Sequence, residues 1–162
     1  MNLTAENLIS LIAAIFTLLL AIFAIDWRNN FREWIALFLF QGEISLVLGS
    51  LVVESGMLDY PVRILPNWYD TSLLFELWVL PILCILYNQI INKRSVWSMG
   101  YCAVLFSAGI TIIEYILEKN TDLIEYIEWS WITTFVTVTL AFWFSRLFIV
   151  AYRRAYHYFE QK

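Results

Sequence analysis

The stretch of sequence that decides the fold is Trp34-Ile-Ala-Leu-Phe-Leu-Phe-Gln-Gly-Glu43-Ile-Ser-Leu-Val-Leu-Gly-Ser-Leu-Val-Val-Glu54. As an α-helix it is long enough to span the apolar core of a bilayer, which is about 30 Å thick. Glu43 lies near its middle, roughly 13 Å from Trp34 at about 1.5 Å per residue. A carboxylate at that depth costs about 2.5–3.5 kcal/mol on insertion scales. We therefore expect Glu43 to be protonated, paired or exposed to water.

The composition indicates an integral membrane protein with no separate soluble domain. Of the 162 residues, 61% are apolar and 15% are charged, against about 45–50% and about 25% in soluble domains. Apolar runs long enough to span a bilayer recur at about 7–26, 33–54, 70–92, 96–118 and 128–150. We predict an all-α fold: one transmembrane domain over residues 1–162, an integral membrane bundle of five transmembrane helices.

The distribution of lysine and arginine predicts the orientation of these helices. One side of the predicted bundle holds Arg28, Arg32, Lys93, Arg94, Arg146, Arg153, Arg154 and Lys162. The opposite side holds only Arg63 and Lys119. Because loops rich in Lys and Arg stay in the cytoplasm, we expect the N-terminus outside and the C-terminus in the cytoplasm.

Four glutamates are candidate ion- or proton-binding residues: Glu43, Glu54, Glu76 and Glu114. Arg32, Glu43 and Glu54 are spaced by eleven residues, which is close to three full turns, so they share one helix face. In the predicted orientation three of the four glutamates occupy the outer half of the bundle, and Glu43 lies below them. This arrangement suggests an acidic cleft open to the outside. The alternative is a packing seam, with a few carboxylates at helix ends that reach interfacial water and have no further role.

Hydroxyl-bearing residues form a second pattern along the predicted helices. The members of this polar seam are Ser50, Ser107, Thr111, Thr134 and Thr137. Small residues let helices approach closely and their hydroxyls bond across the contact, so we expect these faces to meet. Pro81 interrupts the third span close to Glu76 and should remove the backbone bond to the carbonyl of Leu77.

The remaining composition argues against several kinds of function. A net charge of −4 and the absence of a basic stripe make nucleic acid an unlikely partner. Cys84 and Cys102 both fall in apolar spans and read as small buried hydrophobes, so we expect neither a metal site nor a cofactor. No nucleophile elbow, phosphate loop or metal-ligand motif is present, and we expect no enzyme activity.

Three segments resemble a known family. They are Ile112-Ile-Glu114-Tyr-Ile-Leu-Glu-Lys-Asn-Thr-Asp-Leu-Ile-Glu-Tyr126-Ile-Glu-Trp129-Ser-Trp131, Trp27-Arg-Asn-Asn-Phe-Arg-Glu33, and Trp68 with Glu76-Leu-Trp78 and Pro81. Together they resemble an uncharacterised family of small five-helix integral membrane proteins from spore-forming Gram-positive bacteria. The resemblance implies a multi-pass protein of the bacterial plasma membrane. It supplies no reaction, ligand or site residue.

Two functions fit these observations best, ahead of a lipid-modifying enzyme as a third. The first is cation- or proton-linked transport, channel activity or sensing through the intramembrane carboxylates, with a cation or proton as ligand. The second is a non-catalytic membrane interaction or scaffold subunit, whose polar faces bind a second copy or another membrane protein. In both cases the lipid bilayer is the immediate surrounding.

Overall fold

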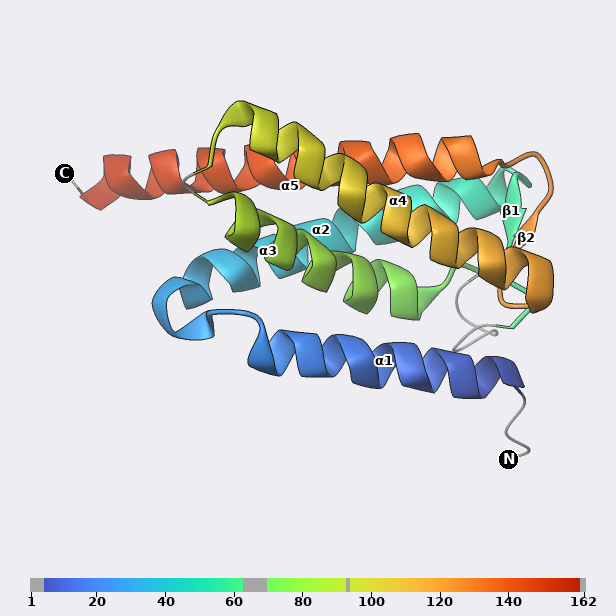
Figure 1. Ribbon diagram of the computed structural model, residues 1–162. Helices are drawn as coiled ribbons and strands as arrows, with labels where there is room; N and C mark the ends of the chain where they lie inside the picture. The colour runs from blue at the N-terminus through green and yellow to red at the C-terminus, as the bar shows by residue number, and fades with distance from the viewer. Residues whose placement is uncertain (1–4, 63–69, 93, 161–162) are drawn as a thin grey trace.

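The computed structural model describes residues 5–62, 70–92 and 94–160 as an all-helical bundle (Figure 1). Its helices are α1 (Ala5–Phe23), α2 (Trp27–Glu54), the π-helix η1 (Phe75–Val79), which continues into α3 (Leu80–Ile91), α4 (Val96–Asn120) and α5 (Trp131–Glu160). The short strands β1 (Leu58–Asp59) and β2 (Glu125–Tyr126) pair antiparallel. The all-α prediction is confirmed. We call the end with β1 and β2 the strand end, and the end where α1 turns into α2 the arginine end.

Short polar residues determine where several helices begin and end. The Asp26 side chain caps α2 by accepting the N–H of Asn29, and the Ser95 hydroxyl caps α4 in the same way. α2 is followed by Gly56, whose φ of 73° is rare for a residue with a side chain. This turn directs the chain from α2 into β1, so it fixes the strand end of the bundle.

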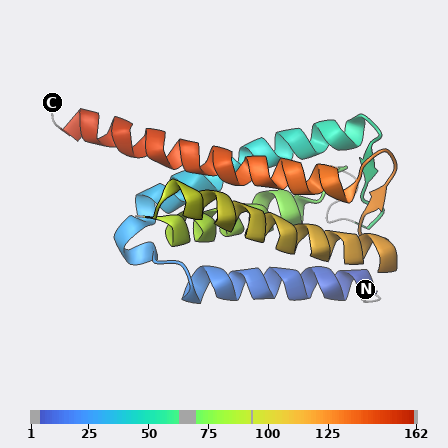
Figure 2. The same cartoon turned by 45° about the horizontal axis from the view of Figure 1, so that its top comes forward.

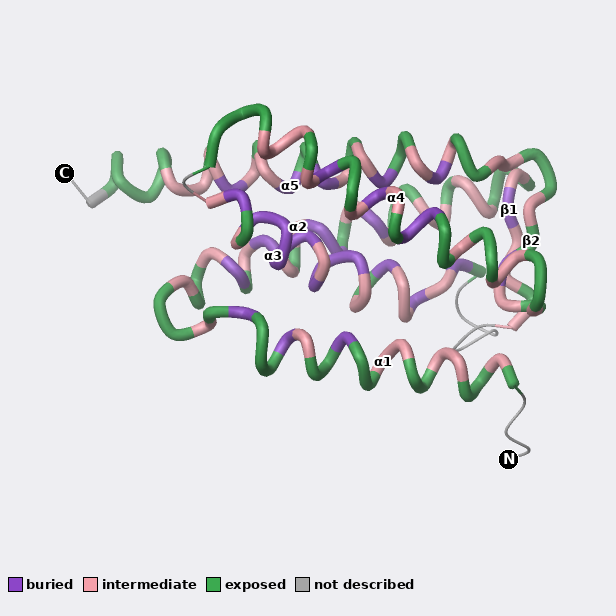
Figure 3. The backbone as a smooth tube through the Cα atoms, in the orientation of Figure 1, coloured by how far each residue is buried: buried purple, intermediate pink, exposed green. Residues whose placement is uncertain are grey.

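Four helices, α1, α2, α4 and α5, are long and apolar enough to cross a membrane. The predicted span 70–92 is corrected, because its regular part is the shorter apolar helix Phe75–Ile91. Nine of the twelve residues of α3 are buried, and Figure 3 shows the burial concentrated there. A helix that is apolar on all sides must be surrounded, and α3 packs against α1, α2, α4 and α5.

α2 and α5 are longer than their apolar runs. α2 starts at Trp27 rather than near residue 33, and Asn30, with φ of −132°, kinks its first turns. α5 continues from its predicted end near residue 150 to Glu160, and its last turns extend past the other helices (Figure 2). The hydropathy pattern marks only the apolar part of each helix, so polar extensions escape it.

Two clusters of buried side chains lie on opposite sides of α3. The first joins Trp34 and Leu37 of α2 to Ile82 and Ile85 of α3, and the second joins Cys84 and Tyr87 of α3 to α4 and α5. Trp34 and Tyr87 are both fully buried. Their burial fixes the faces that α2 and α3 turn to the core.

α1 is attached by few polar contacts. The indole N–H of Trp78 donates to the Thr17 hydroxyl at 2.9 Å. At the turn into α2, the Gln89 side chain accepts the N–H of Asp26 and donates to the carbonyl of Ala24, both at 2.7 Å. These contacts hold α1 against η1 and α3 and leave most of its apolar surface exposed.

Gly49 is required for the close approach of α2 to η1. A Cβ at this position would lie 2.5 Å from Oε1 of Glu76 and 3.0 Å from Oγ1 of Thr71. At Gly109, on the exposed side of α4, a Cβ would meet nothing within 4 Å. The two glycines therefore form a matched pair for substitution.

We predict that Gly49→Ala lowers the free energy of unfolding by about 1–3 kcal/mol through overpacking. Gly109→Ala should leave stability unchanged or raise it, because alanine is the better helix former. Thermal unfolding in detergent, followed by the reaction of buried Cys84 with a thiol dye, measures both. Equal melting temperatures for the two variants would contradict the close contact.

Candidate functional site

A cavity of about 440 Å³ lies toward the strand end, between α2, η1, α4 and α5. Most of its lining is apolar, and its polar lining includes Gln41, Ser45, Glu76, Glu114 and Thr134. Ligand pockets in proteins commonly have this character, with apolar walls and a few convergent polar groups. The two glutamates come from different elements, so the fold and not the sequence spacing brings them together.

Glu76 forms one polar wall of the cavity. It lies on the π-helix, where the N–H of Leu80 bonds to the carbonyl of Phe75, five residues back. Its side chain is 7% exposed and is hydrogen-bonded to Ser45. The Ser45 hydroxyl in turn receives a bond from Nε2 of Gln41 at 3.2 Å. A chain of three polar side chains thus follows one face of α2 to the carboxyl group.

Glu114 forms the facing wall, within a network from β2 and the start of α5. Its Oε1 accepts the Tyr126 hydroxyl at 2.7 Å and the Thr134 hydroxyl at 2.8 Å. The indole of Trp129 donates to the Thr134 oxygen at 2.8 Å. These contacts place the carboxyl group beside the N-terminus of α5, whose backbone dipole favours negative charge.

No described lysine or arginine balances the charge of this glutamate pair. The two carboxyl groups are close enough to interact electrostatically, and within the described ranges neither forms an ion pair with lysine or arginine. Tyr60 lies beside both of them. Burial raises the pKa of the Tyr60 phenol well above its usual value, and the charges of Glu76 and Glu114 add to this. The described groups that bond to the pair are the neutral hydroxyls of Ser45, Tyr126 and Thr134.

Glu43 and Glu54 lie apart from this pair. Both are exposed, as is Arg32, and neither glutamate lines the cavity. The three residues do share one face of α2, as the spacing predicts, but that face points away from the core. The expected row of four glutamates is therefore corrected to a pair. The physical reason is that α2 buries the face of Trp34 and Leu37, which leaves Glu43 on the outside.

The polar seam is divided in the same way. Thr134 belongs to the Glu114 network, whereas Thr137 is exposed and bonds back to the carbonyls of its own helix. Ser107 and Thr111 are buried, and no described residue bonds to their hydroxyl oxygens. Ser50 is partly buried on α2. The seam is thus not one continuous contact.

Sequence reasoning missed Gln41, Ser45, Tyr60 and Tyr126. The first two could have been found, because Gln41, Ser45 and Gly49 recur every four residues and so share a helix face. Tyr60 and Tyr126 lie in connections whose pairing as β1 and β2 has no local signal. The loop arginine Arg63, expected near the acidic cleft, lies outside the described residues.

The cavity opens sideways between α2 and α5. Its outer rim is made by exposed apolar side chains from the flanks of these helices, including Leu48 at 57%, Leu140 at 42% and Phe144 at 57% exposure. Outside the lining of the cavity, aromatic rings pack between α3, α4 and α5. The rings of Tyr87 and Phe106 lie 5.1 and 5.5 Å from that of Phe142, measured between centroids.

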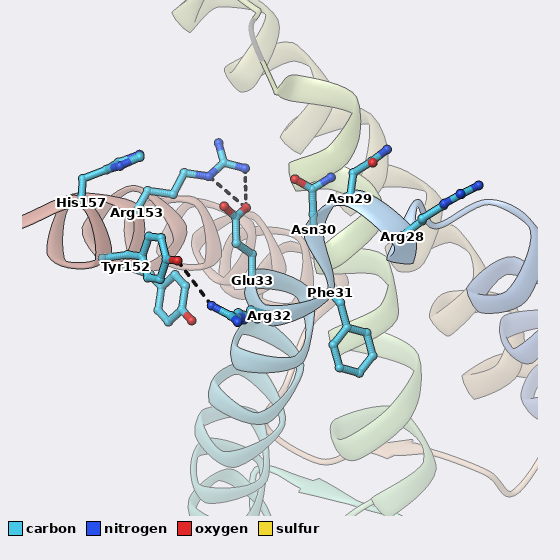
Figure 4. Close-up of a pocket in the computed structure, with 10 residues that line it drawn as sticks. Arg28, Asn29, Asn30, Phe31, Arg32, Glu33, Tyr152, Arg153 and His157 are labelled. Carbon is cyan, nitrogen blue, oxygen red and sulfur yellow. Dashed lines mark hydrogen bonds and ion pairs between the residues drawn. The ribbon is translucent and has the colours of Figure 1, made fainter. Parts of the chain in front are cut away.

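A second cavity, of about 360 Å³, lies at the arginine end between the start of α2 and the end of α5 (Figure 4). Arg153 donates to Oε2 of Glu33 from Nε at 2.9 Å and from Nη2 at 2.6 Å, and to Oδ1 of Asn92 at 2.9 Å. Arg28 and Arg32 beside it are exposed. Here the carboxylate is paired, in contrast to the two glutamates of the first cavity.

Comparison with known proteins adds no relative: no family model matches the chain, and no curated protein or solved structure matches it significantly. Among the residues that the structure describes, no group of three or more His, Cys, Asp or Glu side chains could hold a metal ion. The site is therefore interpreted from its geometry.

We predict that the Tyr60 phenol does not ionise near pH 10, the usual value for tyrosine, while the protein is folded. Because the pKa of Tyr60 is higher in the folded than in the unfolded protein, the contribution of its neutral phenol to stability is present below about pH 10. That contribution is lost as the pH rises further. In an absorbance titration of folded protein, Tyr60→Phe should leave the tyrosinate signal near pH 10 unchanged. In denaturant the same substitution should remove one ninth of the signal of the nine tyrosines. An equal loss in both states would contradict the burial.

We also predict that Arg153→Lys destabilises the arginine end by about 1–2 kcal/mol, because lysine donates from one nitrogen and cannot reproduce the fork that holds Glu33 and Asn92 together. Arg154→Lys is the matched control, since Arg154 is exposed on the same helix. Thermal unfolding in detergent distinguishes them. A shift of equal size in both variants would contradict the role of the fork, because both substitutions keep the positive charge.

Proposed function

We propose that this chain is a multi-pass protein of the bacterial plasma membrane, with the strand end outside and the C-terminus in the cytoplasm. Four apolar helices and the exposed apolar side chains on α1, α4 and α5 support insertion. Orientation is supported by charge, because Arg28, Arg32, Arg94 and Arg153 lie at the arginine end, whereas Lys119 lies in the last turn of α4 at the strand end. The family resemblance of the sequence supports the bacterial location.

We further propose that Glu76 and Glu114 bind either a proton or a cation, each displacing the other. This exchange would be the binding step of proton-linked transport or sensing. The observation that carries this proposal is the pair itself: two carboxyl groups, from η1 and α4, line one cavity, and no described lysine or arginine forms an ion pair with either. Burial in apolar surroundings and mutual repulsion both oppose a second negative charge. Protonation of one carboxyl group, or a cation bound between the two elements, relieves both penalties.

The surroundings of the pair favour a binding site over an open channel. The titratable groups that face it are Tyr60 and Tyr126, with Glu118 one turn further along α4. Tyr126 bonds directly to Glu114, so its hydroxyl can pass or receive a proton. The lining of the cavity comes from the half of the bundle nearer the strand end, so the proposed exchange takes place from that half.

The test is proton release on cation binding. Purified protein in weakly buffered solution with a pH-indicating dye receives methylammonium, sodium or potassium chloride. We expect about one proton to be released per protein, since a cation binds the deprotonated form of the site. Because the proton competes, the apparent affinity should rise with pH.

The matched variants are Glu76→Gln and Glu114→Gln against Glu43→Gln and Glu54→Gln. The first two should abolish proton release, and the second two should retain it, because they remove exposed carboxyls outside the cavity. Each variant is first checked for its melting temperature. Absence of release from the unmodified protein would overturn the proposal, and so would equal effects of all four substitutions.

One observation favours the alternative function, an interaction subunit. Glu43 is exposed among apolar residues such as Leu39 and Val47 on the outside of α2, where contact with lipid is costly. A second copy or another membrane protein covering this face would remove that cost. If Glu43→Gln changes the mass of the complex in detergent while no variant affects proton release, this second function is the better one.

A further inference from the structure

The shape of the cavity limits what the cation can be. A site for a small inorganic cation is a polar cage of oxygen ligands, but this cavity holds about 440 Å³ and is lined mainly by apolar side chains. At about 30 Å³ for a group the size of a water molecule, it has room for about fifteen such groups. That is far more than a bare or hydrated alkali ion fills. A ligand with an apolar portion would fill the remainder.

The opening of the cavity indicates where this ligand comes from. Its rim is formed by Leu48, Leu140 and Phe144, which are exposed on the sides of α2 and α5. In a bilayer those sides face acyl chains. A molecule that enters between α2 and α5 can keep its chain in apolar surroundings throughout, while its polar head moves to the carboxyl groups.

The polar floor selects the head of the ligand. Glu76 and Glu114 contribute negative charge that no described lysine or arginine compensates. A neutral group beside them offers a further acceptor. The side-chain amide of Gln41, which is 2% exposed, donates to the Ser45 hydroxyl, and no described residue bonds to its carbonyl oxygen. A primary ammonium group supplies one positive charge and three hydrogen-bond donors, which fits this floor. A carboxylate or phosphate head would meet like charge.

We propose that the cavity binds a single-chain amphiphile with a primary ammonium head, which enters sideways from the membrane between α2 and α5. The ammonium lies between Glu76 and Glu114, and the chain lies along the apolar groove toward Phe144. A lipid with two acyl chains is too large for the volume. This inference rests on the proposed function, because it assigns the cation that the glutamate pair exchanges for a proton.

The experiment uses the full chain in nanodiscs of zwitterionic phosphatidylcholine and the fluorescence of Trp129, which lines the cavity. The probes are a long-chain primary alkylamine with bromine atoms on its chain, which quench tryptophan, and the alcohol of the same chain. The amine should quench at about ten-fold lower concentration than the alcohol, the ratio expected for a charge-assisted hydrogen bond. Trp129→Phe identifies the part of the signal that comes from the cavity.

Substitutions test the binding of the ammonium head and of the apolar chain separately. Glu76→Gln and Glu114→Gln should raise the concentration of amine needed for quenching to that of the alcohol, whereas Glu43→Gln should leave it unchanged. Ala141 lines the cavity, so Ala141→Phe should fill the groove and abolish quenching while methylammonium still releases a proton. Ala151→Phe, on an exposed turn of the same helix, is its matched control and should behave as the unmodified protein.

The outcomes distinguish this inference from the proposed function. Equal quenching by amine and alcohol, together with proton release by methylammonium, overturns the amphiphile and leaves the proton–cation exchange in place. If neither the amine advantage nor proton release is seen, both are overturned. Quenching by the amine that persists in Glu76→Gln and in Glu114→Gln also overturns the inference, because the head would then be held elsewhere.

Discussion

The burial of α3 is the constraint on which the rest of the structure depends. Nine of its twelve residues are buried, so most of its surface is covered, and α1, α2, α4 and α5 pack around it. The position of this central helix also determines how deeply the segment before it in the chain is buried. Here that segment is η1, and Glu76 is buried because η1 continues directly into α3.

The local backbone then sets the direction of the Glu76 side chain. Pro81 has no N–H, so the carbonyl of Leu77 lacks its usual helical donor, and just before it the N–H of Leu80 bonds five residues back to Phe75. Such π turns add a residue to a helical turn and shift the register of what precedes them. Opposite, Gly49 has no Cβ to obstruct Glu76 Oε1. The proline, the π turn and the glycine together make room for a carboxyl group between two helices.

The sequence was sufficient to locate the helices, but it could not show which face of each helix points to the core. Apolar runs located all five, and the eleven-residue spacing correctly placed Arg32, Glu43 and Glu54 on one face of α2. Both faces of α2 carry polar residues, however, and the choice between them depends on Trp34 and Leu37 packing against α3, which is a tertiary contact. For the same reason Glu76 and Glu114 could be nominated singly, but their meeting depends on how α4 lies across α3. The pairing of β1 with β2, more than sixty positions apart in the chain, has no local signal at all.

The chain itself offers a comparison for the unpaired glutamates. Glu33 is held by two nitrogens of Arg153 and keeps a side-chain exposure of 23%, whereas Glu76 is 7% exposed and has only neutral donors. Removing a carboxylate from water is costly unless an opposite charge and hydrogen bonds replace the hydration. With both carboxyls ionised and nothing between them, the cavity is in its least favourable state, so its occupancy by a proton or an ammonium group is linked to the packing of α2, η1 and α4 around it. A transporter would in addition have to open a path to the arginine end in each cycle, whereas a sensor needs only a rearrangement around the glutamate pair.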